Sequence, residues 1–299
     1  MSATAVRGQA GRRQIHPRGA ARTIRAQRAT NAAVSYAILI AGCLAFLMPL
    51  AWLASTSLKT QDQIFIYPIQ WMPHPVKWGN YRDLFDVAPF ARYIGNTILL
   101  TAVGVIGSLL GSSIAAYAFA RMRFRGRNVL FLIMLSTMMV PSWATIIPSY
   151  IMFAKLGWLD TYLPILVPAF FATPFNTFLI RQFFLTLPVE LEEAARIDGA
   201  GTFRIFATIA LPLAKPALVI VSLYSFLFYW NEFLGPLIYL QTQNKFPLSL
   251  GISNFIGLQS QNYALAMTGA AVAIAPCLIL FFIAQRWFIQ GVVITGVKG

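Results

Sequence analysis

Long uncharged stretches dominate the pattern of hydrophobic and polar positions along this chain. Five stretches of 20 to 40 residues contain no Asp, Glu, Lys or Arg. A helix of roughly 20 mostly apolar residues can cross a bilayer, whereas a strand of a membrane barrel needs only about 10. The length and continuity of these stretches therefore predict helices. We predict six membrane spans, near residues 32–57, 95–119, 129–153, 161–182, 216–240 and 264–286.

The composition agrees with this pattern. Hydrophobic residues make up 58% of the 299 residues and charged residues only 11%, against about 25% in a typical soluble domain. The predicted fold class is an all-α membrane protein with six transmembrane helices in one membrane domain, residues 32–299. Within the second span, Gly107 and Gly111 have the GxxxG spacing that lets helices approach closely, which predicts ordinary helix packing there.

The basic residues predict the orientation of the chain. Residues 1–31 hold seven arginines and no acid, and the loop after the second span reads RMRFRGR. Short cytoplasmic loops are rich in Lys and Arg. We therefore expect both termini, this loop and residues 183–215 to face the cytoplasm. That topology places 17 of the 23 basic residues inside, and the six outside are Lys59, Lys77, Arg82, Arg92, Lys155 and Lys245.

The net charge of +14 is then mostly a signal of topology. A nucleic-acid-binding surface is the rival explanation of the basic N-terminus, and a cleaved signal peptide is another. The apolar core of a signal peptide has about 7–15 residues, whereas residues 32–58 form an uncharged run of 27. We expect residues 1–31 to be a disordered cytoplasmic tail, followed by a first helix that is retained.

Motifs of known enzymes and metal sites are missing. His16 and His74 are the only histidines, no HExxH or CxxC sequence occurs, and no Gly-Lys pair could complete a phosphate-binding loop. We expect no catalytic residue, metal site or cofactor in this chain, so ATP and Mg²⁺ would be bound by another subunit. Glu232 is the one acid in a predicted span. It gives weak support to a proton-coupled carrier, and an interfacial residue that pairs or snorkels explains it better.

Residues 183–215 form a polar interruption between two apolar spans and predict two short helices. Pro188 suits the first turn of the first helix. Acids are favoured at the positive end of a helix dipole, and three follow Pro188, namely Glu190, Glu192 and Glu193. Glu192 and Arg196 are four residues apart, so they can pair along one face of the helix.

A glycine turn is predicted to join these two helices. Gly199 and Gly201 supply the left-handed or flexible positions that end the first helix. Thr202 can then cap the second helix, which Pro212 ends. Ala195 and Gly199 lack bulk on one face of the first helix, and such a face can slide into a groove on another protein.

The same loop resembles a known signature. The spacing EAA-x3-G-x9-I-x-LP of the integral membrane subunits of ABC importers is reproduced by Glu193, Ala194, Ala195, Gly199, Ile209, Leu211 and Pro212. Four further stretches, AYAFARMRFRGRNVLF, RQFFLTLP, WNEFLGPL and GVVITGVKG, resemble carbohydrate-uptake permeases of the MalG type. The resemblance covers roughly residues 32–299.

The resemblance implies a type I ABC importer fold, also called the MetI-like permease fold, with its core at about residues 94–290 and its coupling-helix loop at residues 183–215. The chain would be the permease subunit of a binding-protein-dependent importer in a prokaryotic inner membrane. Its implied partners are a second homologous permease, two cytoplasmic ABC ATPases and an extracytoplasmic sugar-binding protein. The residues assigned to ATPase coupling are Glu192, Glu193, Ala194, Ala195, Arg196, Asp198 and Gly199.

Sugars or oligosaccharides are the implied cargo. Tyr229, Trp230, Asn231 and Glu232 are candidates for the sugar path, because aromatic faces cover sugar rings and Asn or Glu can hydrogen-bond hydroxyls. Helix packing is the competing role of each. The alternatives are a similar permease for glycerol 3-phosphate or another polar solute, an ATP-independent secondary sugar carrier and a membrane enzyme. The intact coupling motif disfavours the carrier, and the missing catalytic cluster disfavours the enzyme.

Overall fold

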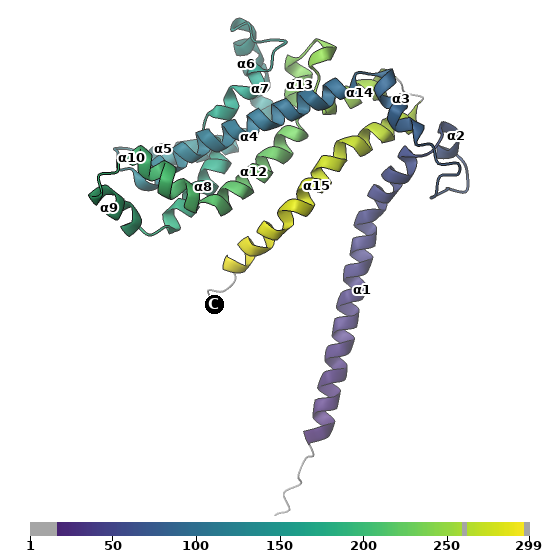
Figure 1. Ribbon diagram of the computed structural model, residues 1–299, viewed down its shortest axis with the longest axis horizontal. Helices are drawn as coiled ribbons and strands as arrows, with labels where there is room; N and C mark the ends of the chain where they lie inside the picture. Colours follow the sequence, from purple (N-terminus) through teal and green to yellow (C-terminus); the bar gives the residue numbers. More distant parts are fainter. Residues whose placement is uncertain (1–16, 259–261, 296–299) are drawn as a thin grey trace, which may run out of the picture. The chain divides into compact units, whose positions relative to one another are not determined.

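The structure is a computed structural model that describes residues 17–258 and 262–295 (Figure 1). Every regular element in these two segments is a helix, which confirms the predicted all-α class. The chain divides into two compact units, residues 1–52 and residues 53–299. Helix α1, Pro17–Ser57, supplies the described part of the first unit, and its portion Thr30–Ser57 is long and apolar enough to cross a membrane.

Helix α1 begins well before the first predicted span. We expected residues 1–31 to be a disordered tail, but residues 17–31 are helical. The reason is local, since Ala, Arg and Gln are good helix formers and Pro17 suits the first helical position. A high density of positive charge was therefore a poor guide to order over this stretch. Residues 1–16 lie outside the described residues.

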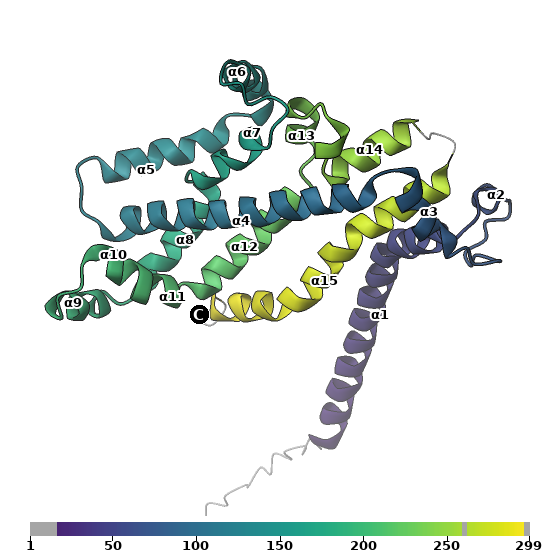
Figure 2. The ribbon, with the colours of Figure 1, turned by 45° about the horizontal axis from the view of Figure 1, so that its top comes forward.

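Helix α4, Phe90–Arg121, is the central element of the second unit (Figures 1 and 2). It packs along α8, Pro174–Thr186, and α12, Lys215–Trp230. Helix α15, Tyr263–Thr295, packs against α12. One core cluster lies where the C-terminal half of α4 meets α8, and it includes Ala116, Tyr117, Ile180 and Phe184. The second unit is thus a helical bundle built on α4.

Glycines allow α4 to pack this closely. A Cβ atom added at Gly111 would lie 2.3 Å from the carbonyl oxygen of Phe170, in the 3₁₀ helix η2, Pro168–Phe170. A Cβ atom at Gly107 would lie 2.9 Å from the ring of the same phenylalanine. The GxxxG pair therefore packs against protein backbone, as its spacing predicted.

Six candidate spans occur among the described residues if each of two bent helix pairs is one span. Four helices pass by themselves, namely Thr30–Ser57, Phe90–Arg121, Leu163–Thr186 and Tyr263–Gln285. The bent pairs are Arg127–Met139 with Ser142–Lys155, and Thr202–Leu213 with Lys215–Trp230. The number of predicted spans agrees with this count, and the third and fifth predicted spans fall in the bent pairs.

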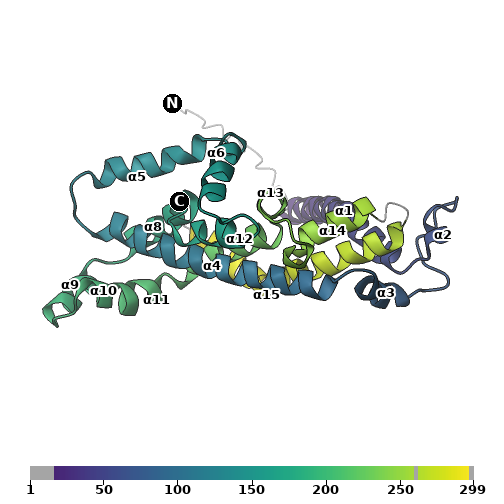
Figure 3. The same cartoon turned by 90° about the horizontal axis from the view of Figure 1, so that it is seen from above.

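The third span is broken near its middle. Helix α5, Arg127–Ser136, continues into η1, Thr137–Met139, and then the chain bends by 100° into α6, Ser142–Lys155 (Figure 3). Val140 at the break has extended backbone angles. The cause is Pro141, which has no N–H to donate and which disfavours a helical conformation in the residue before it.

The fifth span ends earlier than predicted. Helix α12 stops at Trp230, not near residue 240, and a separate short helix, α13, Leu234–Tyr239, follows. The Glu232 carboxylate accepts a hydrogen bond of 2.7 Å from the backbone N–H of Gly235, so it satisfies a group at the start of α13. Glu232 therefore stabilises the start of a new helix just after α12 ends.

The remaining helices are short and lie in the connecting segments. Helix α3, Gly79–Val87, lies in the segment before α4. Helices α9 and α10 lie at the end of the second unit opposite α3 (Figures 1 and 2). The others are α2 Gln61–Ile64, α7 Leu163–Leu166, α9 Glu190–Ile197, α10 Thr202–Ile205, the π-helix η3 Phe206–Ala210, α11 Leu211–Leu213, η4 Gln243–Lys245 and α14 Leu248–Leu258.

Candidate functional site

Helix α9 forms where the polar loop predicted a first short helix. Three acids occupy its first turn and Arg196 its last, which is the charge order that a helix dipole favours. Gly199 has a φ angle of +80°, and the N–H of Ala200 donates to the carbonyl oxygen of Ala195 at 2.9 Å. The predicted left-handed glycine at the end of this helix is therefore confirmed.

The second half of the loop differs from the prediction. Gly201 is extended rather than left-handed, and it is the residue that precedes α10, so Thr202 lies inside the helix and does not cap it. Pro212 does not end the second helix, because the chain remains helical from Thr202 through Leu213. The π-helix Phe206–Ala210 precedes the proline, and such wide turns help a helix to accommodate a residue without an N–H.

The side chains of α9 divide into an inner and an outer face. Glu192 is only 4% exposed. Glu193 and Ala194 are exposed, as are Arg196, Asp198 and Gly199, while Ala195 is half-buried. Six of the seven predicted coupling residues are thus accessible to a partner in full or in part, and the exception is Glu192.

Arg121, the last residue of α4, holds Glu192 in place. Its Nε atom lies 3.1 Å from Oε1 of Glu192, as an ion pair without hydrogen-bond geometry. Its Nη2 atom donates to the carbonyl oxygens of Phe184 at 2.6 Å and Leu187 at 2.5 Å, where α8 ends. The hydroxyl of Tyr117 donates to Oε2 of Glu192 at 3.4 Å. One buried carboxylate therefore connects α9 to α4, and one guanidinium connects α4 to the end of α8.

The predicted pair between Glu192 and Arg196 is present too. Nη2 of Arg196 lies 3.3 Å from Oε2 of Glu192, but half of the Arg196 side chain is exposed. A cavity of about 740 Å³ lies beside these groups, between the end of α4, the following loop and α9. Its lining contains both acids and arginines, namely Arg121, Arg123, Arg127, Glu192, Glu193 and Arg196, together with Tyr117, Ala120, Met122, Val189 and Thr202.

Two large apolar residues at this end of the molecule were missed by the sequence analysis. Ile197 is 87% exposed and Phe203 is 77% exposed. They flank the glycine turn, so they lie next to the accessible face of α9. Their signal in the sequence was a bulky apolar residue on each side of DGAG, inside an otherwise polar loop.

The four predicted sugar-path residues are placed in different surroundings. Tyr229 and Trp230 line two different cavities: the one at Tyr229 contains several hydroxyl and amide side chains, whereas the one at Trp230 is mostly apolar. The Trp230 indole N–H donates to the carbonyl oxygen of Ala273 at 2.9 Å, so its ring is part of the packed interior. Asn231 donates to the carbonyl oxygen of Leu227 at 2.8 Å at the end of α12. The Glu232 carboxylate accepts the hydrogen bond from Gly235 at the start of α13 that is described above. The four residues therefore do not form one site.

The cavity at Tyr229 measures about 230 Å³ and lies between α4, α8 and α12. The Tyr229 hydroxyl lies 3.5 Å from Oγ of Ser108, and the Asn176 amide donates to Oγ of Ser225 at 3.3 Å. All of its described lining residues are uncharged, and they are Ser108, Thr173, Phe175, Asn176, Tyr224, Ser225, Phe228 and Tyr229. The sequence analysis missed all of these except Tyr229, although Tyr224 and Phe228 are four residues apart on one face of a helix.

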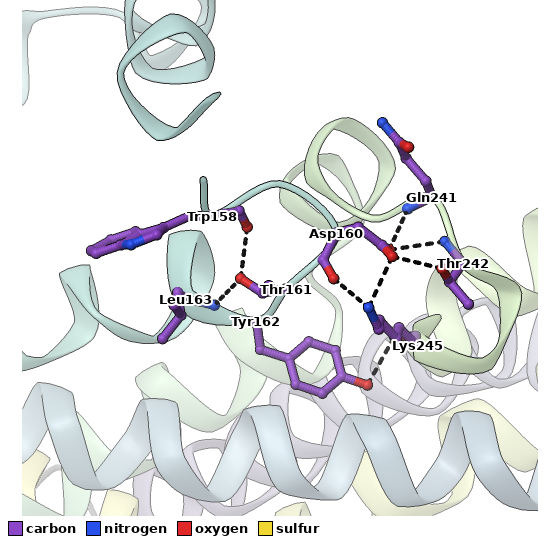
Figure 4. Close-up of polar contacts among 8 residues, drawn as sticks. All are labelled: Trp158, Asp160, Thr161, Tyr162, Leu163, Gln241, Thr242 and Lys245. Atoms are coloured by element: carbon purple, nitrogen blue, oxygen red, sulfur yellow. Dashed lines mark hydrogen bonds and ion pairs between the residues drawn. The ribbon is translucent and has the colours of Figure 1, made fainter. Parts of the chain in front are cut away.

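A polar clamp joins two connecting segments away from α9 (Figure 4). Asp160 lies between α6 and α7, and its carboxylate accepts hydrogen bonds from the backbone N–H groups of Gln241 and Thr242 at 3.0 and 2.9 Å. Lys245 lies 2.8 Å from the same carboxylate. Hydrogen bonds from Lys245 and Thr242 hold the pKa of Asp160 well below its ordinary value. The clamp therefore fixes the segment after α13 to the segment before α7.

Comparison with known proteins places this chain in a family. Residues 107–294 match the family described as "Binding-protein-dependent transport system inner membrane component". The arabinooligosaccharides transport system permease protein AraQ of Halalkalibacterium halodurans is 37% identical over 228 residues, which cover 76% of this chain and 81% of that protein. The sn-glycerol-3-phosphate transport system permease protein UgpE of Pectobacterium atrosepticum is 34% identical over 268 residues, which cover 87% and 95%.

A solved structure agrees with these relatives. A bacterial ABC transporter involved in the import of the acidic polysaccharide alginate contains a chain that superposes with a TM-score of 0.78 at 28% sequence identity. The superposition covers 88% of this chain and 98% of that chain. The predicted fold and the predicted family are thereby confirmed. This chain belongs to the family of binding-protein-dependent transport system inner membrane components, which are the multi-pass permease subunits of ABC importers.

Proposed function

We propose that this permease lines one half of the path by which an ATP-driven importer moves a neutral sugar or oligosaccharide into the cell. The observation that carries the proposal is the geometry of α9. Its outer face, with Glu193 and Ala194, is accessible, while Glu192 ties its inner face to the end of α4. A helix whose outer face is accessible and whose inner face is fixed to a membrane span can enter a groove on a partner and transmit the partner's movement to that span.

The partner of α9 is a cytoplasmic ABC ATPase. Both chain termini and the loop 183–215 face the cytoplasm, because this topology places most of the arginines and lysines inside. The complete importer contains this chain, a second homologous permease, two ATPase subunits and an extracytoplasmic binding protein. The ATPases bind ATP and Mg²⁺, since this chain has no Gly-Lys pair for a phosphate-binding loop.

The contact with the ATPase is made by the accessible residues of the loop. They are Glu193, Ala194, Ala195, Arg196, Asp198 and Gly199, and Ile197 and Phe203 add apolar area on both sides of the glycine turn. A large side chain that is exposed in the isolated chain and buried in the complex is a typical source of binding energy. The small side chains at positions 194, 195 and 199 let the backbone of α9 approach the partner closely.

Transport follows an alternating-access cycle. ATP binding closes the two ATPases, and the movement of α9 opens the path between the permeases toward the outside. The binding protein releases its cargo into this path, and ATP hydrolysis returns the importer to its inward-facing state. Each ligand shifts the equilibrium because it binds one state better than the other.

The cavity at Tyr229 supports a neutral, hydroxylated cargo. Hydroxyl and amide groups of Ser108, Asn176 and Ser225 can bind sugar hydroxyls, and the rings of Tyr224 and Phe228 are more than half exposed and can cover a sugar face. Glycerol 3-phosphate is the second candidate, because UgpE is a relative at 34% identity. A phosphate is usually bound by arginine, lysine or a helix N-terminus. The uncharged lining of this cavity therefore favours the sugar.

The test is uptake into proteoliposomes that contain this chain with its second permease, ATPase and binding protein. Wild-type importer and Glu193→Lys are compared, with a labelled neutral trisaccharide and with labelled sn-glycerol 3-phosphate. We expect ATP-dependent uptake of the trisaccharide only, and its loss in Glu193→Lys although that variant still inserts into the membrane. Uptake by the purified chain without ATP, or normal uptake by Glu193→Lys, would refute the coupling role. Preference for the phosphate ester would refute the cargo.

A further inference from the structure

The Arg121–Glu192 pair is the best-buried ion pair among the described residues, and it lies at the first turn of α9. The two side chains are 8% and 5% exposed, whereas the other three ion pairs each contain a side chain that is more than 40% exposed. Among the three acids in the first turn of α9, Glu192 alone is buried. Glu190 and Glu193 in the same turn are exposed, so the burial of Glu192 is specific to that position and does not apply to the whole helix.

Stability alone does not explain a charged pair at this place. A buried ion pair is often no more stabilising than apolar side chains of the same volume. Apolar contacts, however, let two helices slide past each other, whereas charge-assisted contacts have fixed directions. Arg121 of α4 donates two such hydrogen bonds to Phe184 and Leu187 at the end of α8. Its Nε atom also pairs with Glu192 of α9 at 3.1 Å, so one side chain joins two other elements to α4.

Helices α4 and α8, which Arg121 joins, also reach the cavity at Tyr229. Ser108 of α4 lies 13 residues before Arg121, a distance of about 20 Å along a helix, and it lines the cavity. Asn176 of α8 lines the same cavity, eight residues before Phe184. A rigid displacement of the first turn of α9 can therefore be transmitted to the cavity through α4 and α8. Tyr117 adds a second contact between α4 and Glu192, one turn before Arg121.

We propose that the Arg121–Glu192 pair transmits the movement of α9 to α4 and α8, so that Glu192 is a positioning residue inside the permease and not a contact of the ATPase. This inference rests on the proposed function, because it assumes that α9 is moved by an ATPase. It separates Glu192 from the neighbouring Glu193, although the sequence analysis had assigned both to ATPase coupling. Glu193 receives the movement at the surface, and Glu192 passes it to the spans.

The experiment measures ATP hydrolysis and sugar uptake in the same proteoliposomes, with the complete importer. The variants are Glu192→Gln, Glu192→Asp, Arg121→Gln and the double variant Glu192→Gln/Arg121→Gln. Glu190→Gln is the matched control, because Glu190 lies in the same helical turn and is exposed. The quantity compared is the amount of sugar imported per ATP hydrolysed, which a change in the amount of assembled importer does not alter.

We expect Glu192→Gln to assemble and to hydrolyse ATP within about twofold of wild type, while sugar imported per ATP falls at least tenfold. Glu192→Asp keeps the charge and recovers most of the ratio, and Glu190→Gln equals wild type. The double variant is no worse than Arg121→Gln, since two residues that act as one unit are not additive. If Arg121→Gln does not fold, the Glu192 series alone decides the question.

Two results would overturn the inference. The first is a Glu192→Gln importer with wild-type rates of both hydrolysis and uptake. The second is an equal fall of hydrolysis and uptake, which indicates lost assembly and a merely structural pair. Failure of the proposed function looks different, because the wild-type importer then shows no ATP-dependent uptake at all. If wild type imports sugar and Glu193→Lys does not, while Glu192→Gln is normal, only the transmission role is refuted.

Discussion

Gly111→Ala is the substitution whose cost can be worked out most directly from the structure. The added Cβ atom would lie 2.3 Å from the carbonyl oxygen of Phe170 and 2.8 Å from its carbonyl carbon. These are backbone atoms, so no side-chain rotation relieves the overlap. The backbone of α4 would have to move away from η2 by about 1 Å to restore an ordinary van der Waals contact. Overpacking of this kind costs about 1–3 kcal/mol, and we expect the upper half of that range.

Two other glycines of α4 provide matched controls. Gly95 has no atom within 4 Å of the position of an added Cβ, so Gly95→Ala gains the helix propensity of alanine, about 1 kcal/mol at most. A Cβ atom added at Gly107 would lie 2.9 Å from the ring of Phe170, which can rotate, and 3.2 Å from the carbonyl carbon of Ala169, so Gly107→Ala should be intermediate. We therefore expect Gly111→Ala to be less stable than Gly95→Ala by about 2–4 kcal/mol.

Reversible unfolding of the purified chain in mixed micelles, followed by tryptophan fluorescence, measures this series. The predicted order of unfolding midpoints is Gly95→Ala, then Gly107→Ala, then Gly111→Ala as the least stable. If Gly111→Ala is as stable as Gly95→Ala, α4 and η2 do not approach as closely as the structure indicates, and the packing argument fails.

Three further predictions concern other parts of the second unit. Asp160→Asn should lower stability by about 1 kcal/mol at pH 7. The groups that bind Asp160 lower its pKa from 3.8, so its contribution to folding stability is complete above pH 3.8 and is lost as the pH falls below that value. Thermal unfolding of wild type and Asp160→Asn at pH 7 and at pH 3 measures both the loss of stability and its pH dependence. Ile197→Ser should leave thermal stability unchanged within about 0.5 kcal/mol, since the side chain is 87% exposed, and should weaken binding of the ATPase about tenfold in a titration. Tyr229→Phe removes the hydroxyl near Ser108, so the KM for sugar uptake should rise about fivefold, the equivalent of one hydrogen bond of about 1 kcal/mol, with unchanged stability.

Local features of the fold were predictable because their causes are local. Continuous apolar runs determine where spans lie, and Gly199 ends α9 because glycine adopts a positive φ at little cost. The break before Pro141 also has a local cause, and it could have been predicted from the proline alone. The end of α12 at Trp230 was harder to predict. It depends on what Glu232 binds, and an apolar context made that residue look like part of a longer span.

The candidate site was predictable only in part, because the role of a residue there depends on distant neighbours. Glu192 and Glu193 are adjacent acids in the first turn of α9, and Glu192 is the one that pairs with Arg121, a residue far earlier in the chain. Tyr229 and Trp230 are adjacent aromatic residues, yet Tyr229 lines the cavity with the hydroxyl and amide side chains, while Trp230 lines a separate, mostly apolar cavity and donates a hydrogen bond to Ala273 of α15. No local pattern distinguishes the members of either pair.

The break between η1 and α6 has a consequence for what surrounds this chain in the membrane. Where two helices meet at a sharp bend, the last carbonyl groups of one and the first amide groups of the other lack partners within their helices. Hydrocarbon cannot satisfy such groups, and a non-helical backbone at membrane depth is tolerated only against protein or a water-filled space. Met139, Val140 and Trp143 at the bend are all more than half exposed in the isolated chain. If residues 127–155 cross the bilayer as one bent span, lipid cannot be the sole neighbour of this face, and another protein chain or bound water must complete its solvation.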